Sequence, residues 1–296
     1  MIFIDHYKDL FNIINMSFQN NKSILILNLL IALIPISYIL GNLLLNLNIF
    51  LIIICSFILF KLDIFRLNLN FIDKLLIFLF LYIATNGVLN NFLNFKFPDA
   101  PDQNIVLLKS FLYLRFVFLY FAIKFLIYRD LINFKIIFVF FGLCGLFVSI
   151  DVIIQFAFGK DLFGFESSGR RLSGPFGEEL ISGSFIQRFF VFIPFTLLAF
   201  YKIKKNIIFQ ISFSIISIIS ILGLILSGNR IPLLLFICML PLLAFYEKTL
   251  RKNILATFLV LIISLITLMN NSSETKSHYI AFMEKGTQII NYTKYR

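Results

Sequence analysis

Apolar runs of about 16–22 residues, rich in Leu, Ile and Phe, make up most of this chain, and short polar segments separate them. Of its 296 residues, 60% are hydrophobic and 14% are charged. A soluble domain carries roughly 25% charged residues, so the composition excludes a soluble globular fold. Runs of this length cross a bilayer as helices, and none alternates strictly as the strands of an outer-membrane barrel do. We therefore predict an all-α, polytopic transmembrane helix bundle.

The apolar runs predict about nine membrane spans. Residues 1–22 are expected to form an amphipathic segment on the cytoplasmic surface, and 23–269 the transmembrane domain. Residues 159–181 are expected to form a polar loop between spans five and six, and 270–296 the start of an incomplete outer loop. The spans fall at roughly 23–40, 45–60, a third ending near 89, 105–127, 134–158, 182–200, a seventh ending at 226, an eighth from 231, and 255–269.

The connections between the spans predict their orientation, because Lys and Arg concentrate on the cytoplasmic side of a membrane. With the N-terminus inside, the inner segments hold most of the connecting cations. The net charge of +11 follows from this topology, so we expect no nucleic-acid partner. The outer connections hold only Lys96, Lys160, Arg170, Arg171 and Arg230, leaving aside residues 270–296.

The longest polar run is 159–183, which reads GKDLFGFESSGRRLSGPFGEELISG and contains six of the 13 glycines. Within it, Arg170 and Arg171 come just before a turn at Ser173-Gly174-Pro175. A second outer arginine, Arg230, ends the short connection Ser227-Gly228-Asn229-Arg230 between spans seven and eight. Arginines that meet on one face can bind phosphate in a bidentate manner. The alternative is that the arginines of the loop are simply solvated.

Two carboxylates, Glu178 and Glu179, lie where the loop enters span six. One of them could act as a general base toward an acceptor hydroxyl. The alternative is structural, because carboxylates at the first turn of a helix stabilise its N-terminus.

Ionisable side chains inside a span cost roughly 2.5–3.5 kcal/mol on insertion scales, so they mark candidate functional positions. Four such residues are Lys109, Arg115, Asp151 and Arg188. We expect them to line one polar cavity beneath the loop and to bind substrate, together with Gln155 and Arg170. The alternative for Asp151 is an ion pair with an arginine that locks two helices together. Lys124, near the inner end of span four, is expected to extend to the membrane surface.

Four motifs appear in a fixed order, and over roughly 105–269 they resemble the O-antigen ligase and Wzy-type polymerase superfamily of bacterial membrane glycosyltransferases. They read Asp151-x-x-x-Gln155, then Gly159-Lys-Asp161-Leu-Phe-Gly164, then Arg171-Leu-Ser-Gly174-Pro-Phe176 before a span, and finally Ser227-Gly228-Asn229-Arg230.

The resemblance implies a multi-pass protein of the bacterial inner membrane that uses neither a metal nor a cofactor. It would transfer a glycan from undecaprenyl pyrophosphate to a hydroxyl of an acceptor glycan or of lipid A-core, at the periplasmic face. Arg171 and Arg230 match the essential arginines of the family, which hold the pyrophosphate. The family also uses a histidine late in a large periplasmic loop. This chain departs there, because its only histidines are His6 and His278.

Three functional classes stay open at this point. Within the resemblance, the Glu178–Glu179 pair after Arg171-Leu-Ser-Gly174 favours a polymerase over a ligase. The rival is a transporter or flippase that binds an anionic or lipid-linked substrate through the same arginines. Broken helices or an internal repeat would favour that rival, and neither is evident in the sequence. The third class is a structural membrane subunit.

Overall fold

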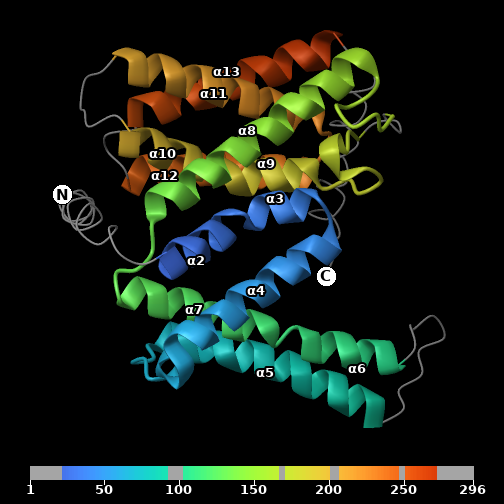
Figure 1. Cartoon of the computed structure of the whole chain (residues 1–296). Helices are drawn as coiled ribbons and strands as arrows, with labels where there is room; N and C mark the ends of the chain where they lie inside the picture. Colours follow the sequence, from blue (N-terminus) through green and yellow to red (C-terminus); the bar gives the residue numbers. More distant parts are fainter. Residues whose placement is uncertain (1–21, 93–102, 167–170, 201–206, 247–250, 272–296) are drawn as a thin grey trace, which may run out of the picture. The chain divides into compact units, whose positions relative to one another are not determined.

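The computed structural model describes residues 22–92, 103–166, 171–200, 207–246 and 251–271 (Figure 1). In these ranges the regular structure is helical. The β-structure described there is an isolated antiparallel bridge between Lys160 and Glu166. The all-α prediction is therefore confirmed. Nearly all of the predicted cytoplasmic segment 1–22 and of the outer segment 270–296 lies outside the described residues.

The chain divides into two compact units, 1–137 and 138–296, which are described separately. Each predicted span coincides with one helix or with two consecutive helices. The first unit contains α2 (Lys22–Ala32), α3 (Ile34–Ile39), α4 (Asn42–Phe60), η1 (Lys61–Phe65), α5 (Phe71–Phe92), α6 (Gln103–Leu112) and α7 (Arg115–Tyr128). Across the boundary runs α8 (Phe134–Phe158), and the second unit continues with η2 (Gly174–Phe176), α9 (Ser182–Phe190), α10 (Phe192–Phe200), α11 (Ile207–Leu226), α12 (Arg230–Tyr246) and α13 (Arg251–Asn271).

Several of these helices are apolar enough to cross a membrane. By length and composition, the described residues contain 4 such segments: Asn42–Phe65, Phe71–Asn90, Leu107–Tyr128 and Phe134–Phe158. In Phe71–Asn90, only 17% of the most apolar 18-residue stretch is buried inside the protein. An apolar surface of that extent needs hydrocarbon or a partner to cover it, which is typical of a membrane protein. The count of nine spans and their orientation stay predictions.

Three predicted spans are interrupted, contrary to the expectation of continuous helices. Leu33 separates α2 from α3, and Val191 separates α9 from α10. Pro35 and Pro194 follow these two breaks. Because proline has no N–H, neither residue can donate to the carbonyl one turn before it, and its ring opens the helix there. The hydropathy of a span does not register such a local defect.

The third interruption has no proline. Between α6 and α7, the amide of Leu114 donates to the carbonyl of Phe111 at 3.0 Å, and that of Phe116 donates to Tyr113 at 3.1 Å. These are the i→i+3 bonds of a tight 3₁₀ turn, which often marks a hinge or a strained sequence. Arg115 begins α7 immediately after this turn.

In the first unit a polar cluster joins α5 to α7. Asp73, in the first turn of α5, accepts hydrogen bonds from the hydroxyl of Tyr120 and from Lys124 Nζ. Tyr120 and Lys124 stand one turn apart on α7, so both reach the same carboxylate. Lys124 was expected to extend to the membrane surface, and the structure adds an interaction that was not predicted, because the 20% exposed side chain forms an ion pair with Asp73.

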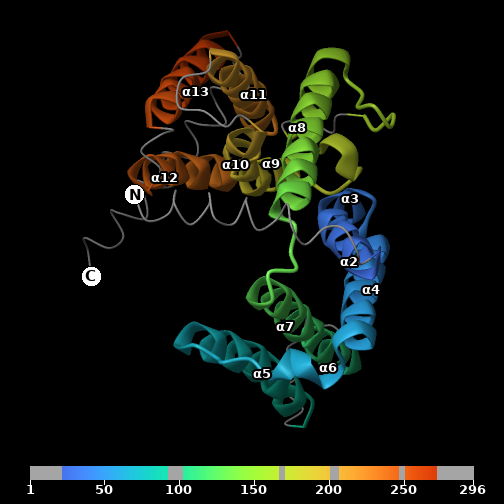
Figure 2. The ribbon, with the colours of Figure 1, turned by 60° about the vertical axis from the view of Figure 1, so that its left-hand side comes forward.

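In the second unit the C-terminal half of α8 packs closely on α11. A Cβ atom added to Gly223 of α11 would lie 2.8 Å from the Cα of Ser149 on α8. The two backbones can approach so closely only because position 223 has no side chain. In turn, α11 contacts α9 and α13, which Figure 2 shows beside it. This packing fixes the end of α8 on which Asp151 and Gln155 lie.

Candidate functional site

The site is built on the last two turns of α8. Asp151 and Gln155 are four residues apart and therefore lie on one face of the helix. Both are fully buried, with 0% of their surface exposed. The helix ends at Phe158, and Gly159 follows with a φ of 75° while its amide donates to the carbonyl of Gln155 at 2.9 Å. A glycine in this left-handed conformation terminates a helix without strain, and the polar loop (residues 159–181) begins there.

The first part of the polar loop folds around Asp161. One carboxylate oxygen, Asp161 Oδ1, accepts the amide hydrogens of Phe163 at 3.0 Å and Phe165 at 2.6 Å. Leu162 donates its own amide to Asp151 Oδ1 at 2.9 Å, which ties this turn to α8. The predicted motif 159–164 is therefore a compact turn, and Asp161 is 6% exposed. The sequence did not mark Asp161 as a separate structural residue.

An exposed ion pair closes the base of this turn. Lys160 Nζ lies 2.9 Å from a carboxylate oxygen of Glu166. The hydrogen bond from Lys160 lowers the pKa of Glu166 below its ordinary value, because it favours the charged carboxylate.

Gln155 holds the second part of the loop. Its Oε1 accepts the amide hydrogen of Gly174 at 2.9 Å, while its Nε2 donates to the carbonyl of Phe165 at 3.3 Å and to Ser173 Oγ at 3.4 Å. Gln155 was predicted to bind substrate. In the structure its amide group is engaged in positioning the loop.

Three separate segments meet at Leu172, the residue after Arg171. The amide of Leu172 donates to the carbonyl of Ser227 at 3.3 Å. Its carbonyl accepts the hydroxyl of Ser182, the first residue of α9, at 2.6 Å. The motif Arg171–Phe176, the start of α9 and the turn Ser227–Arg230 (the SGNR turn) thus lie side by side. Two motifs that are far apart in the sequence are joined by a direct backbone hydrogen bond.

The arginines of these motifs differ in their surroundings. Arg171 is exposed, and Arg230 is half-buried at the first position of α12. Leu172 contacts Ser227, so Arg171 is directly next to one end of this contact in the chain, and Arg230 follows the other end by three positions. Arg170 lies outside the described residues.

Glu178 and Glu179 are both exposed and precede α9, which begins at Ser182. The amide of Glu179 donates to the carbonyl of Phe176 at 3.2 Å, which closes the short turn after η2. No acidic residue lies in the first turn of α9. The structural alternative of carboxylates within that first turn therefore does not hold, and both remain candidate bases.

Three other predicted site residues lie on helices outside the loop, namely Arg188 on α9, Lys109 on α6 and Arg115 on α7. Arg188 is exposed in the last turn of α9, where a cation complements the helix dipole. Lys109 is exposed in the last turn of α6, and the Arg115 guanidinium lies 4.9 Å from the ring centroid of Phe116. Lys109 and Arg115 belong to the first unit, so a cavity shared with Asp151 stays a prediction.

Asp151 forms no ion pair with any residue that the structure describes. Its Oδ1 accepts the Leu162 amide, and its Oδ2 is buried without a hydrogen-bond partner among the described residues. The described part of the chain therefore does not contain the ion pair between Asp151 and an arginine that was the predicted alternative.

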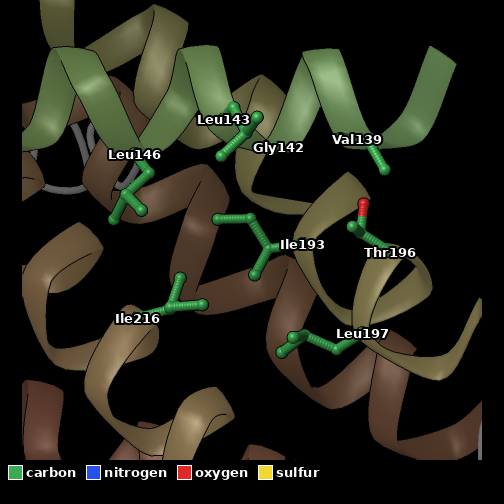
Figure 3. A pocket seen from close by; sticks show the side chains of 8 residues that line it. All are labelled: Val139, Gly142, Leu143, Leu146, Ile193, Thr196, Leu197 and Ile216. Carbon is green, nitrogen blue, oxygen red and sulfur yellow. The ribbon is translucent and has the colours of Figure 1, made fainter. Parts of the chain in front are cut away.

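A separate apolar cavity of about 470 Å³ lies in the second unit, between α8, α10 and α11 (Figure 3). Thr196 is the one polar side chain among its lining residues, and its hydroxyl is engaged by the carbonyls of Phe138 at 2.7 Å and Phe192 at 2.8 Å. The cavity thus suits hydrocarbon rather than a polar ligand. It is lined by Val139, Gly142, Leu143, Leu146, Ile193, Thr196, Leu197 and Ile216.

No protein-family model, no curated protein and no solved structure matches this chain. The resemblance of its motifs to the ligase and polymerase superfamily therefore rests on the motif residues alone.

Proposed function

We propose that this chain is a multi-pass glycosyltransferase of the bacterial inner membrane, of the O-antigen polymerase or ligase type. It would transfer a glycan from undecaprenyl pyrophosphate to an acceptor sugar hydroxyl at the periplasmic face. The observation that supports this best is the hydrogen bond between Leu172 and Ser227, which joins the two arginine motifs. Such a junction is what a diphosphate clamp requires, because a diphosphate presents several oxygens to more than one guanidinium.

In the proposed reaction, the acceptor oxygen attacks the anomeric carbon of the donor sugar. The bond from that carbon to the pyrophosphate oxygen breaks, and its electron pair leaves with undecaprenyl pyrophosphate. Arg171 and Arg230 would stabilise the charge that develops on this leaving group. Glu178 or Glu179 would take the proton of the acceptor hydroxyl, since both carboxylates are exposed on the same loop.

The apolar cavity is consistent with a lipid-linked substrate. Its lining on α8 extends from Val139 to Leu146, and Leu146 precedes Asp151 by about 7.5 Å along the helix axis. A polyprenyl chain whose diphosphate bound at the loop would thus find hydrocarbon-lined space farther along the same helix.

A transporter or flippase is the alternative, and the interrupted helices now favour it more than the sequence did. Discontinuous helices form the substrate sites of many transporters. However, the breaks at Leu33 and Val191 each precede a proline, which explains them without a ligand. The 3₁₀ turn before Arg115 has no proline to explain it, so a transporter would be expected to bind its substrate at this break.

One assay separates the two functions. The purified protein is reconstituted in liposomes with an undecaprenyl-pyrophosphate-linked oligosaccharide and an acceptor glycan. Release of undecaprenyl pyrophosphate together with a lengthened glycan supports the transferase. Movement of the intact lipid between leaflets, with no release, would instead support the flippase and contradict the transferase.

A further inference from the structure

The first turns of two helices meet at the side chain of Asn229. This residue immediately precedes α12, and Gly183 lies in the first turn of α9. A Cβ atom added to Gly183 would lie 2.8 Å from the Cβ of Asn229 and 2.9 Å from its Nδ2. The start of α9 is therefore packed directly against the Asn229 amide, beside the Leu172–Ser227 contact.

The amide nitrogen of Asn229 lacks an acceptor. Asn229 is 8% exposed, and its Nδ2 is buried with no hydrogen-bond partner among the described residues. An amide nitrogen only donates hydrogen bonds, and leaving such a buried donor unpaired costs free energy. Native structures rarely tolerate this, so an unpaired donor calls for a ligand or an ordered water.

The groups that surround this amide are also donors. The first N–H groups of a helix have no acceptor within the helix, and Ile181, at the cap position of α9, makes no side-chain cap bond. Both helix starts carry partial positive charge, Arg230 is the first residue of α12, and Arg171 adjoins Leu172. Helix N-termini with converging donors are ready sites for phosphate groups.

The neighbouring carboxylate does not fill this role. Asp151 Oδ2 lies 3.6 Å from where a Cβ on Gly174 would be, and the Cβ of Ser182 lies 3.8 Å from that same position. The carboxylate thus comes near the start of α9. It nevertheless leaves Asn229 Nδ2 without an acceptor among the residues that the structure describes, so the donor is available to a bound ligand.

We propose that Asn229 Nδ2 and the first turn of α9 form a binding site for a diphosphate group, with Arg171 and Arg230 beside it. Recognition of a diphosphate needs only these donors. That the diphosphate belongs to a polyprenyl lipid rests on the proposed function. Asn229 is on this proposal a substrate-binding residue that orients the diphosphate between the two arginines.

The test measures diphosphate binding by isothermal titration calorimetry on the full chain in detergent. Inorganic pyrophosphate and a short-chain polyprenyl pyrophosphate are the two probes. Asn229→Asp keeps the size of the side chain and remains a favourable residue before a helix, but replaces the donor by an anion. Asn229→Ala removes the donor without adding charge. Asn253→Asp on α13 is the matched control, because it makes the same chemical change away from the site.

We expect the Kd for pyrophosphate to rise about tenfold or more in Asn229→Ala, which is the loss of one hydrogen bond to a charged group. In Asn229→Asp the Kd should rise further, and in Asn253→Asp it should stay unchanged. The unfolding temperature of Asn229→Asp should stay near that of the wild type, which excludes a loss of folding. Absence of diphosphate binding in the wild type, or wild-type Kd values in both Asn229 variants, would overturn the proposal.

The two probes distinguish the source of the diphosphate. Equal Asn229-dependent affinity for both probes indicates that the free diphosphate group is what the site recognises. Tighter Asn229-dependent binding of the polyprenyl probe indicates a lipid substrate. If binding depends on Asn229 but no glycan is transferred in the liposome assay, the site stands and the transferase fails. Transfer that is unaffected in both Asn229 variants would instead retain the transferase and remove this site.

Discussion

Gln155 Oε1 accepts the backbone N–H of Gly174 at 2.9 Å, across 19 residues of sequence. The same side chain donates to the carbonyl of Phe165 and to Ser173 Oγ. One buried amide at the end of α8 thus holds both parts of the polar loop, on either side of the residues that the structure does not describe. The direction in which Arg171 leaves the loop depends on this anchor, because Ser173 and Gly174 follow it closely in the chain.

Replacement of Gln155 should therefore destabilise the loop before it affects any chemistry. We expect Gln155→Ala to lower the free energy of unfolding by about 1–3 kcal/mol, because it leaves buried donors and acceptors unpaired. Gln155→Glu keeps the acceptor for Gly174 but removes the donor, and should also destabilise the protein. Thermal unfolding in detergent measures both effects, with Asn253→Ala as the control. An unchanged unfolding temperature in both Gln155 variants would contradict the anchoring role.

The sequence predicted the helices well, because a lipid environment demands long apolar helices and hydropathy reports them directly. The bounds predicted for span five, 134–158, are those of α8. The interruptions at Leu33 and Val191 were missed although Pro35 and Pro194 are visible in the sequence. A proline inside an apolar run leaves the hydropathy of that run high, so hydropathy alone does not show the kink.

The sequence marked the segments that form the candidate site, but it did not predict the contacts between them. The order of the motifs indicated that Arg171 and Arg230 belong to one site, and the structure joins their segments through Leu172 and Ser227. The structural role of Gln155 and the pairing of Lys124 with Asp73 depend on contacts between residues far apart in the chain. A single sequence contains no local signal for such contacts.

Close packing of α8 on α11 leads to a prediction about two glycines. A Cβ on Gly223 would lie 2.8 Å from the backbone of Ser149, whereas the nearest atom to a Cβ on Gly142 is Thr196 Oγ1 at 3.4 Å. We expect Gly223→Ala to destabilise the protein by about 1–3 kcal/mol, since the helices must move apart. Gly142→Ala should be close to neutral, because it relieves the helical cost of glycine. Thermal unfolding of both variants tests the contact, and equal stability would contradict it.

The Asp73 cluster predicts a strong coupling between two residues of the first unit. Removing Lys124 leaves a carboxylate that is 7% exposed without its cation. We expect Lys124→Met alone to cost about 3 kcal/mol, the low end for a buried pair, because Lys124 keeps some contact with solvent. Asp73→Asn alone should be similarly harmful, and the double variant should cost less than the sum of both. A double-mutant cycle of unfolding free energies measures this coupling, and strict additivity would exclude it.

The proposed diphosphate clamp makes arginine irreplaceable by lysine at two positions. Lysine keeps the positive charge but cannot form two parallel hydrogen bonds to a phosphate. We therefore expect Arg171→Lys and Arg230→Lys to lower glycan transfer by about 10²-fold or more, as the loss of an oxyanion-stabilising donor does. Arg170→Lys should have a much smaller effect, because Arg171 is the residue attached to Leu172. The readout is release of undecaprenyl pyrophosphate from the reconstituted protein. Arg66→Lys, an exposed arginine paired with Asp63 at 3.2 Å, is the matched control and should transfer at the wild-type rate. Wild-type transfer by both Arg171→Lys and Arg230→Lys would show that bidentate contacts from these arginines do not drive the reaction.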